Sequence, residues 1–196
     1  MIYPPDFTAP YAKLRRAHLA AHRIAALAPA HRAVVQAGGC VGLWPLALAT
    51  YFRHVHTFEP APTNAACLAA NIAGVPSITA YPEALGAAQA AVGLTRRKAT
   101  AGLWRVDGAG EIPMVTLDER CATAPIDALV LDVEGMELDV WRGAARLIAR
   151  WRPLLWFEYL TAQPDLLAWL AAQGYTEPQP GMAGDCYSVH RGGRDA

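Results

Sequence analysis

Three carboxylate residues stand at the ends of two strongly apolar runs in the second half of the chain. Asp132 and Glu134 close the run 127–133, and Glu158 closes the run 154–158. Carboxylates that share one mouth repel one another, which raises the pKa of at least one of them. Such a group suits the binding of a cationic ligand or general-base work, so we predict these three as catalytic residues. The structural alternative is helix capping by Glu134 or Glu137 and a paired Glu158.

A glycine-rich turn, GGCVG at 38–42, follows the apolar run 32–37. Glycines let a backbone approach a ligand closely, and the start of the next helix offers free N–H groups. The pattern GGxxG differs from the GxGxxG of dinucleotide enzymes and from the P-loop. Glu59 follows Gly38 by 21 positions, close to the roughly 20-residue interval to a carboxylate that grips ribose hydroxyls. The pair indicates a nucleoside ligand; the alternatives are a tight structural turn and a solvated strand-end acid.

Residues at strand ends need a sheet that brings those ends together. Hydrophobic periodicity predicts helices over 11–28, 43–52, 63–73, 137–151 and 163–172. Strands are predicted over 32–37, 54–58, 77–81, 127–133 and 154–158, with the last candidates at 175–177 and 186–190. Alternating strands and helices indicate a parallel sheet covered on both faces, with ligands at the carboxyl ends of its strands. The stretch 83–120 has the weakest pattern, with short strands and a hairpin turn predicted at 107–110.

The composition indicates one globular domain. The chain has 196 residues, of which 54% are hydrophobic, and its formal net charge is zero, which argues against nucleic-acid binding by bulk electrostatics. We divide it into an N-terminal helical extension, 1–30, and a catalytic core, 31–190. No apolar run reaches the ~18 residues of a membrane span, and the first residues do not resemble a signal peptide, so we expect a cytoplasmic protein without a membrane partner. The four cysteines form no CxxC pair, and we predict no metal site.

Three segments carry a family resemblance: VVQAGGCVGLWPLALA, HTFEPAPTNAACLAANI and PIDALVLDVEGMELDVWRGAARLIARWRPLLWFE. Their most specific part is DVEG-x-E-x-x-V-x-x-G-A followed by P-x-x-x-x-E. From about Val34 to Glu158 the sequence resembles the FkbM family of S-adenosylmethionine-dependent methyltransferases. The resemblance implies an α/β, Rossmann-like class I methyltransferase fold. In that fold a mostly parallel seven-stranded sheet, with its last strand antiparallel, carries helices on both faces.

The resemblance also implies S-adenosyl-L-methionine as the cofactor. The residues that it assigns to cofactor binding are Gln36, Gly38, Gly39, Cys40, Gly42, Glu59, Pro60, Glu83, Ala84 and Asp132. The glycines match the loop around the methionine part, Glu59 matches the ribose acid, and Glu83 and Ala84 match the adenine contact. Asp132 matches the residue beside the methionine amino group and the transferred methyl. The family loop resembles D-x-G-A-N-x-G, so Gln36 replaces an acid and Cys40 an asparagine; Gln36 can still hydrogen-bond an ammonium group but brings no charge.

The leading hypothesis is therefore O-methylation of a hydroxyl on a sugar or small metabolite, with a small-molecule or saccharide acceptor as partner. A nicotinamide-dependent oxidoreductase shares the glycine turn, but GGxxG and DVEG fit it poorly. A cofactor-binding module without turnover stays open because of Gln36. A nucleic-acid methyltransferase is not favoured, since only the basic run 96–98 speaks for it. Little chain precedes the first strand to form a lid, which leaves the site open or closed by a second copy in a homo-oligomer.

Overall fold

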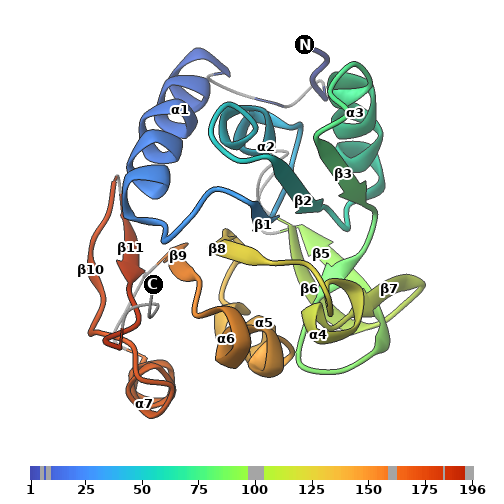
Figure 1. The fold of residues 1–196 in the computed structure, drawn as a ribbon. Helices are drawn as coiled ribbons and strands as arrows, with labels where there is room; N and C mark the ends of the chain where they lie inside the picture. Colours follow the sequence, from blue (N-terminus) through green and yellow to red (C-terminus); the bar gives the residue numbers. More distant parts are fainter. Residues whose placement is uncertain (5–6, 8–9, 97–103, 159–162, 183, 193–196) are drawn as a thin grey trace.

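A seven-stranded, mostly parallel sheet forms the centre of the molecule in the computed structural model, which describes all residues except 5–6, 8–9, 97–103, 159–162, 183 and 193–196 (Figure 1). Its strands are β1 (Ala33–Ala37), β2 (His54–Phe58), β3 (Ile78–Tyr81), β8 (Ile126–Leu131), β9 (Leu154–Glu158), β10 (Gln179–Pro180) and β11 (Asp185–Ser188). They lie in the order β10-β11-β9-β8-β1-β2-β3, and β11 runs antiparallel to both of its neighbours. The sheet is thus mixed and mostly parallel, as the resemblance implies, with β11 as its antiparallel strand.

Helices cover both faces of this sheet. One face carries α1 (Pro10–Leu27), α2 (Leu43–Leu48) and α3 (Pro62–Ile72). The other carries α4 (Leu117–Arg120), α5 (Glu137–Arg142), α6 (Ala145–Trp151) and α7 (Pro164–Ala172). Successive residues of the central strands therefore pack into opposite cores: Val34 faces the α1 side and Val35 the α5 side. Burial on both faces explains why most residues of β1, β8 and β9 are apolar in the sequence, with Gln36 and Asp127 as buried polar exceptions.

The stretch with the weakest pattern forms a separate four-stranded sheet, inserted between β3 and β8. It consists of β4 (Ala84–Leu85), β5 (Ala90–Arg96), β6 (Trp104–Ala109) and β7 (Ile112–Val115), in the order β4-β7-β5-β6. The hairpin turn predicted at 107–110 is wrong, because residues 107–109 belong to β6, where Ala109 pairs with Val92. The register between β5 and β6 shifts between Val92 and Leu94, and this irregularity accommodates Gly108 at φ +64° inside the strand.

The helix predicted over 137–151 is divided in two at residues 143–144. Gly143 lies against the backbone of Gly86, where an added Cβ would sit 2.0 Å from the Gly86 carbonyl oxygen. Asp118, at the start of α4, then accepts hydrogen bonds from the backbone N–H groups of Arg146 (3.0 Å) and Leu147 (2.8 Å) at the start of α6. Contacts with the inserted segment thus end one helix and begin the next, which periodicity alone does not reveal. No helix among the described residues is both long enough and apolar enough to cross a bilayer.

Candidate functional site

A pocket opens at the carboxyl edge of the main sheet. Its empty volume, including the part open to solvent, is about 1150 Å³. The segments that follow β1, β2, β3 and β8 all contribute to its lining, together with residues of α1, β5 and β6. Of the predicted site residues, those that line it are Gly38, Gly39, Cys40, Glu59, Pro60, Glu83, Ala84, Asp132 and Glu134. The expectation that function gathers at the ends of parallel strands thus agrees with the pocket's position.

The glycine turn is pressed between the ends of two neighbouring strands. Gly38 has φ +83°, and a Cβ there would lie 2.1 Å from the carbonyl oxygen of Asp132. A Cβ on Gly39 would lie 2.7 Å from the Thr57 hydroxyl oxygen. The N–H groups of both glycines donate to the carbonyl of Phe58, at 3.0 and 2.9 Å. Only glycine allows this course, which brings the backbone of the turn to the pocket surface.

The Glu59 side chain holds the glycine turn in place. Its carboxylate accepts hydrogen bonds from the backbone N–H of Cys40 (2.6 Å) and of Ala61 (2.9 Å), and it also bonds the side chain of Asn64. The residue is only 4% exposed. Burial raises the pKa of the Glu59 carboxyl, while these hydrogen bonds work in the opposite direction. A carboxylate has about four acceptor positions, so Glu59 keeps roughly one for a ligand hydroxyl while it holds the loop in place.

The two positions where the loop departs from the family pattern have different surroundings. Gln36 is fully buried in β1 and does not line the pocket. Its Oε1 accepts a hydrogen bond from the Thr57 hydroxyl (2.6 Å), and its Nε2 donates to the carbonyl of Ala37 (3.0 Å). Cys40 does line the pocket, and burial followed by the charge of Glu59 raises the pKa of its thiol to about 12. The thiol therefore stays protonated at neutral pH and is a poor nucleophile.

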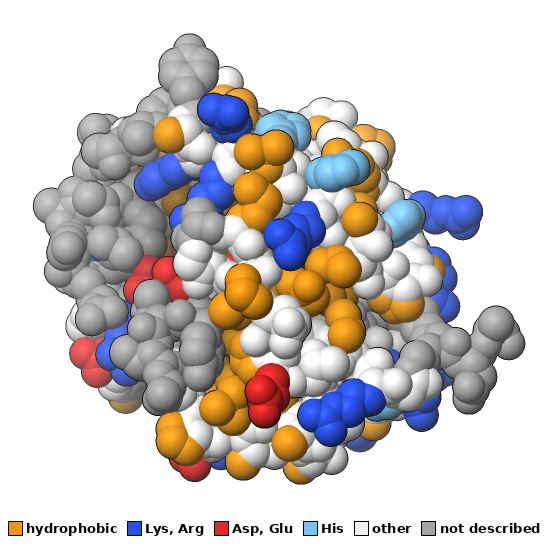
Figure 2. Space-filling model, turned by 90° about the vertical axis from the view of Figure 1, so that its left-hand side faces the viewer, with side chains coloured by type: hydrophobic (Ala, Val, Ile, Leu, Met, Phe, Trp, Pro, Cys, Tyr) orange, Lys and Arg blue, Asp and Glu red, His pale blue; other side chains and the backbone are white. Residues whose placement is uncertain are grey.

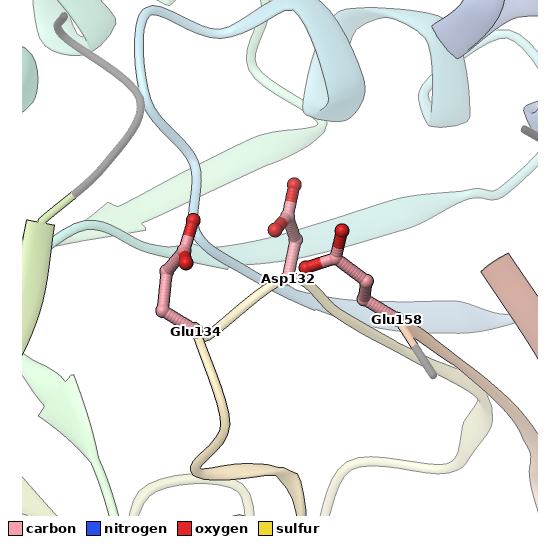
Figure 3. Close-up of side chains that lie close together, drawn as sticks. All are labelled: Asp132, Glu134 and Glu158. Carbon is pink, nitrogen blue, oxygen red and sulfur yellow. The ribbon is translucent and has the colours of Figure 1, made fainter. Parts of the chain in front are cut away.

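The three predicted catalytic carboxylates form one cluster. Asp132 and Glu134 follow β8, Glu158 ends β9, and one oxygen of each lies within 4.8 Å of the other two. Figure 3 shows Glu134 and Glu158 on either side of Asp132, with the side chains pointing to the same side of the sheet edge. Glu134 has φ +55° and Gly135 φ +95°, and a non-glycine residue in this region is strained. The turn after β8 thus holds Glu134 in the pocket lining in an unfavourable backbone conformation.

The pKa of the Asp132 carboxyl is strongly raised. Although its side chain is open to the pocket, protein surrounds it on its other sides, and this burial is the first cause that raises its pKa, to about 7. The negative charges of Glu158, Glu134 and Asp185 add to the effect, and Arg16 opposes it. A carboxyl group with a pKa near 7 is suited to accept a proton at neutral pH. The cluster could also hold a divalent cation, since carboxylate oxygens are its preferred ligands.

One wall of the pocket is basic and comes from α1, and the sequence analysis did not predict it. Lys13 and Arg16, which are three positions apart on α1, both line the pocket. The Arg16 guanidinium pairs with Asp185 (2.7 Å), while its Nε is buried and has no hydrogen-bond partner among the described residues. Phe7 completes this wall, with the Lys13 Nζ 4.5 Å from its ring centroid. The segment before the first strand therefore covers part of the site, whereas its length predicted a site that is open or closed by a second copy.

Basic and acidic groups meet on this face of the molecule. Figure 2 shows acidic side chains beside basic ones at the left of the view, next to residues that are not described. The clue in the sequence was the pair Lys13 and Arg16 at helical spacing, beside the alanine-rich stripe that the same helix buries. A second missed set, the apolar residues Leu94, Trp104 and Val106, lines the pocket from the inserted sheet. Of the basic run 96–98, Arg96 lies with its guanidinium carbon 5.3 Å from the Trp104 ring centroid, and 97–98 lie outside the described residues.

Comparisons with known proteins agree with this architecture. The family model described as "Methyltransferase FkbM domain" matches residues 36–177. No curated protein matches the sequence at a significant level.

Solved structures similar to this chain include a methyltransferase FkbM from Methylobacillus flagellatus KT, with 16% identity and a TM-score of 0.58. That match covers 83% of this chain but only 44% of the other, so the chain spans less than half of that protein. A ribosomal protein L11 methylase from Lactobacillus delbrueckii subsp. bulgaricus has 12% identity and a TM-score of 0.59, over 96% of this chain and 83% of that one. TrmK from M. capricolum, solved with S-adenosyl-homocysteine, has 9% identity and a TM-score of 0.52, over 86% and 65%.

Proposed function

The chain belongs to the FkbM methyltransferase family, and on this premise we propose that it transfers a methyl group from S-adenosylmethionine to a hydroxyl of a small-molecule or saccharide acceptor. The main support for the proposal is that a candidate cofactor loop and candidate proton acceptors line one pocket. The glycine turn between β1 and α2 and the carboxylates Asp132 and Glu134 line the same space. A nucleoside cofactor and a proton acceptor are thereby brought within reach of each other.

The residues of the pocket fit the charges of this cofactor, which carries a sulfonium, an ammonium and a carboxylate group. The carboxylates of the cluster suit its two positive charges. Lys13 and Arg16 suit its carboxylate, and the buried Nε of Arg16, which has no partner among the described residues, is a donor left over for it. Pro60, Ala84 and Leu85 offer apolar surface to a flat ring. Glu59 has about one acceptor position left for a ribose hydroxyl.

The bound cofactor supplies a methyl group on a sulfonium, whose carbon–sulfur bond breaks with its electron pair returning to sulfur as the acceptor oxygen attacks. The protein's task is then chiefly positioning and proton transfer. Asp132 accepts the proton of the acceptor hydroxyl, because its pKa of about 7 leaves much of it ionised and still basic at neutral pH. Glu134 and Glu158 act on Asp132 through their negative charges, which help to keep that pKa high.

Calorimetry with S-adenosylhomocysteine and S-adenosylmethionine tests the proposal, with NAD as a control ligand. We expect both sulfur compounds to bind and NAD not to bind. Glu59→Ala removes the acceptor of two backbone hydrogen bonds and should weaken binding at least about tenfold, because a buried loop donor is then left unpaired. Glu177→Ala, at an exposed position outside the pocket lining, is the matched control and should bind as the wild type does.

Product formation is then measured by mass spectrometry as the gain of one methyl group on hydroxyl acceptors. Circular dichroism verifies that each variant is folded. A folded wild type that binds neither sulfur compound at millimolar concentration would reduce the assignment to one of fold. Cofactor binding without product over a broad acceptor panel would favour a binding module instead of an enzyme.

A further inference from the structure

One wall of the pocket comes from the inserted sheet and is apolar. Leu94 of β5 and Trp104 and Val106 of β6 line the pocket, while Arg105 and Asp107, which alternate with them along β6, are exposed. In the antiparallel pairing of the two strands Leu94 lies opposite Val106, and Arg96 lies opposite Trp104. The pocket side of this strand pair is therefore apolar apart from Arg96, which lies against Trp104, and the other side presents Arg105 and Asp107 to solvent. The pair belongs to neither core of the main sheet.

Trp104 is the largest surface on this wall. Its side chain is half-buried, and the Arg96 guanidinium carbon lies 5.3 Å from its ring centroid. A cation at that distance from an indole is attracted to the ring and restricts its orientation. Aromatic side chains supply large contact areas, and ligand pockets are lined mainly by apolar and aromatic residues.

The strand-end loops and α1 already supply the groups that suit the cofactor, which leaves the wall for the acceptor. Resting on the function proposed above, we propose that Leu94, Trp104 and Val106 bind the acceptor, and that this acceptor is a hydroxyl compound with a flat apolar ring system. The aliphatic side chains of Leu94 and Val106 offer no hydrogen bonds. A sugar ring packed on them would leave its hydroxyl groups without partners, at a cost in binding free energy that an aromatic ring avoids.

The position of the wall suits the reaction. Glu134 and Met136 of the β8–α5 turn line the same pocket as Trp104. A planar acceptor held against the indole can therefore present a hydroxyl on its edge to the carboxylate cluster while its faces stay in apolar surroundings. Stacked or edge-to-face contact with the indole would fix the plane of the acceptor, and a fixed plane is what alignment of an attacking oxygen requires.

The test measures binding of 2-naphthol, as the planar probe, to full-length protein saturated with S-adenosylhomocysteine. Methyl β-D-glucopyranoside is the polar probe. We expect 2-naphthol to bind and the glucoside to bind at least tenfold more weakly. Trp104→Ala should weaken 2-naphthol binding about tenfold, through loss of the aromatic contact, and Trp104→Phe should recover most of it. Arg105→Ala, on the exposed face of the same strand, is the control and should change 2-naphthol affinity less than about twofold.

Each other result overturns the inference in a recognisable way. Tighter binding of the glucoside, or 2-naphthol affinity that is the same in Trp104→Ala and wild type, removes the planar acceptor but leaves the methyltransferase proposal intact. A Trp104→Ala variant that loses S-adenosylhomocysteine binding instead assigns the wall to the cofactor. Failure of the wild type to bind S-adenosylhomocysteine overturns the proposed function and this inference together.

Discussion

The two sheets of this protein differ in how their residues are buried. Each central strand of the main sheet packs both faces against helices, and all residues of β1 and β8 are buried. In the inserted sheet, β6 has no buried residue and β5 has one, Val92. The main sheet supplies the glycine turn and the carboxylates, and the inserted sheet supplies the apolar wall.

The difference suggests a division of labour. Residues at the ends of deeply buried strands are held in position by two hydrophobic cores, which suits groups that must meet a reacting atom with little error. A hairpin with one exposed face can change its side chains at little cost to the core, which suits the recognition of a particular acceptor. The predictions below test whether catalysis and stability reside in the first region and selectivity in the second.

The largest effect is expected from Asp132→Asn, which removes the proposed proton acceptor from the main sheet. Methyl transfer should fall by about 10²–10⁴-fold, the usual contribution of a general base, while S-adenosylhomocysteine still binds. In the wild type, kcat/KM should rise with pH and level off above about pH 7, because the carboxyl must be ionised to take a proton. Steady-state kinetics over pH 5–9 measures both effects.

Glu158→Gln serves as the companion variant. It removes a negative charge that raises the pKa of Asp132, so the rise in kcat/KM should move to lower pH. An unchanged profile in this variant, or full activity in Asp132→Asn, would break the assignment of catalysis to the edge of the main sheet.

A smaller difference between the two sheets is expected in the free energy of unfolding of glycine variants. Gly38→Ala in the main sheet places a Cβ 2.1 Å from a backbone oxygen at φ +83°, and should lower the free energy of unfolding by about 3 kcal/mol or more. Gly108→Ala in β6 also has a positive φ, +64°, but its Cβ would meet no atom within 4 Å. It should cost only about 1–2 kcal/mol. Urea denaturation of the two variants and the wild type gives the difference directly; equal losses would argue against the contrast.

The smallest effect concerns the pH dependence of stability. The Asp132 carboxyl has a pKa of about 7 in the folded state against 3.8 as its ordinary value. Between these values the folded protein holds a proton that the unfolded chain releases, so the free energy of unfolding should fall as pH rises. Because solvent reaches this side chain, we expect a loss of about 1 kcal/mol. Denaturation of wild type and Asp132→Asn between pH 4 and pH 8 should show a fall that is larger in the wild type by about this amount, because other buried carboxyl groups such as Glu59 contribute in both proteins. Parallel curves would contradict it.

The sequence was most informative where burial is deepest. The ranges of β2 and β9 were predicted to the residue, and the edge of the sheet where the site lies followed from strand alternation. Three carboxylates from two strands were expected to meet, and they do. Apolar runs with glycine or acidic ends are strong signals because both faces of such strands must be covered.

The inserted sheet and the basic wall were harder to predict for physical reasons. The strands of the inserted sheet are short and mostly exposed, so alternation is weak, and an irregularity in β5–β6 places Asp107 and Gly108 inside a strand where their types predict a turn. Lys13 and Arg16 lie at the edge of the buried face of α1, where sequence alone does not distinguish a pocket residue from one that faces only solvent. Their place in the pocket depends on how α1 packs against the sheet, and on the pairing of Arg16 with Asp185, which the sequence does not encode locally.

The ion pair between Arg16 and Asp185 joins residues 169 positions apart, and this has a consequence for folding. Contacts between distant parts of a chain form late, because the entropy of closing a long loop must be overcome first. During synthesis, α1 leaves the ribosome long before β11 exists, so this ion pair cannot form until nearly the whole chain has been made. A truncated or partly folded chain without β11 would keep Lys13 and Arg16 but would leave the Arg16 guanidinium without the Asp185 carboxylate that holds it in the wall.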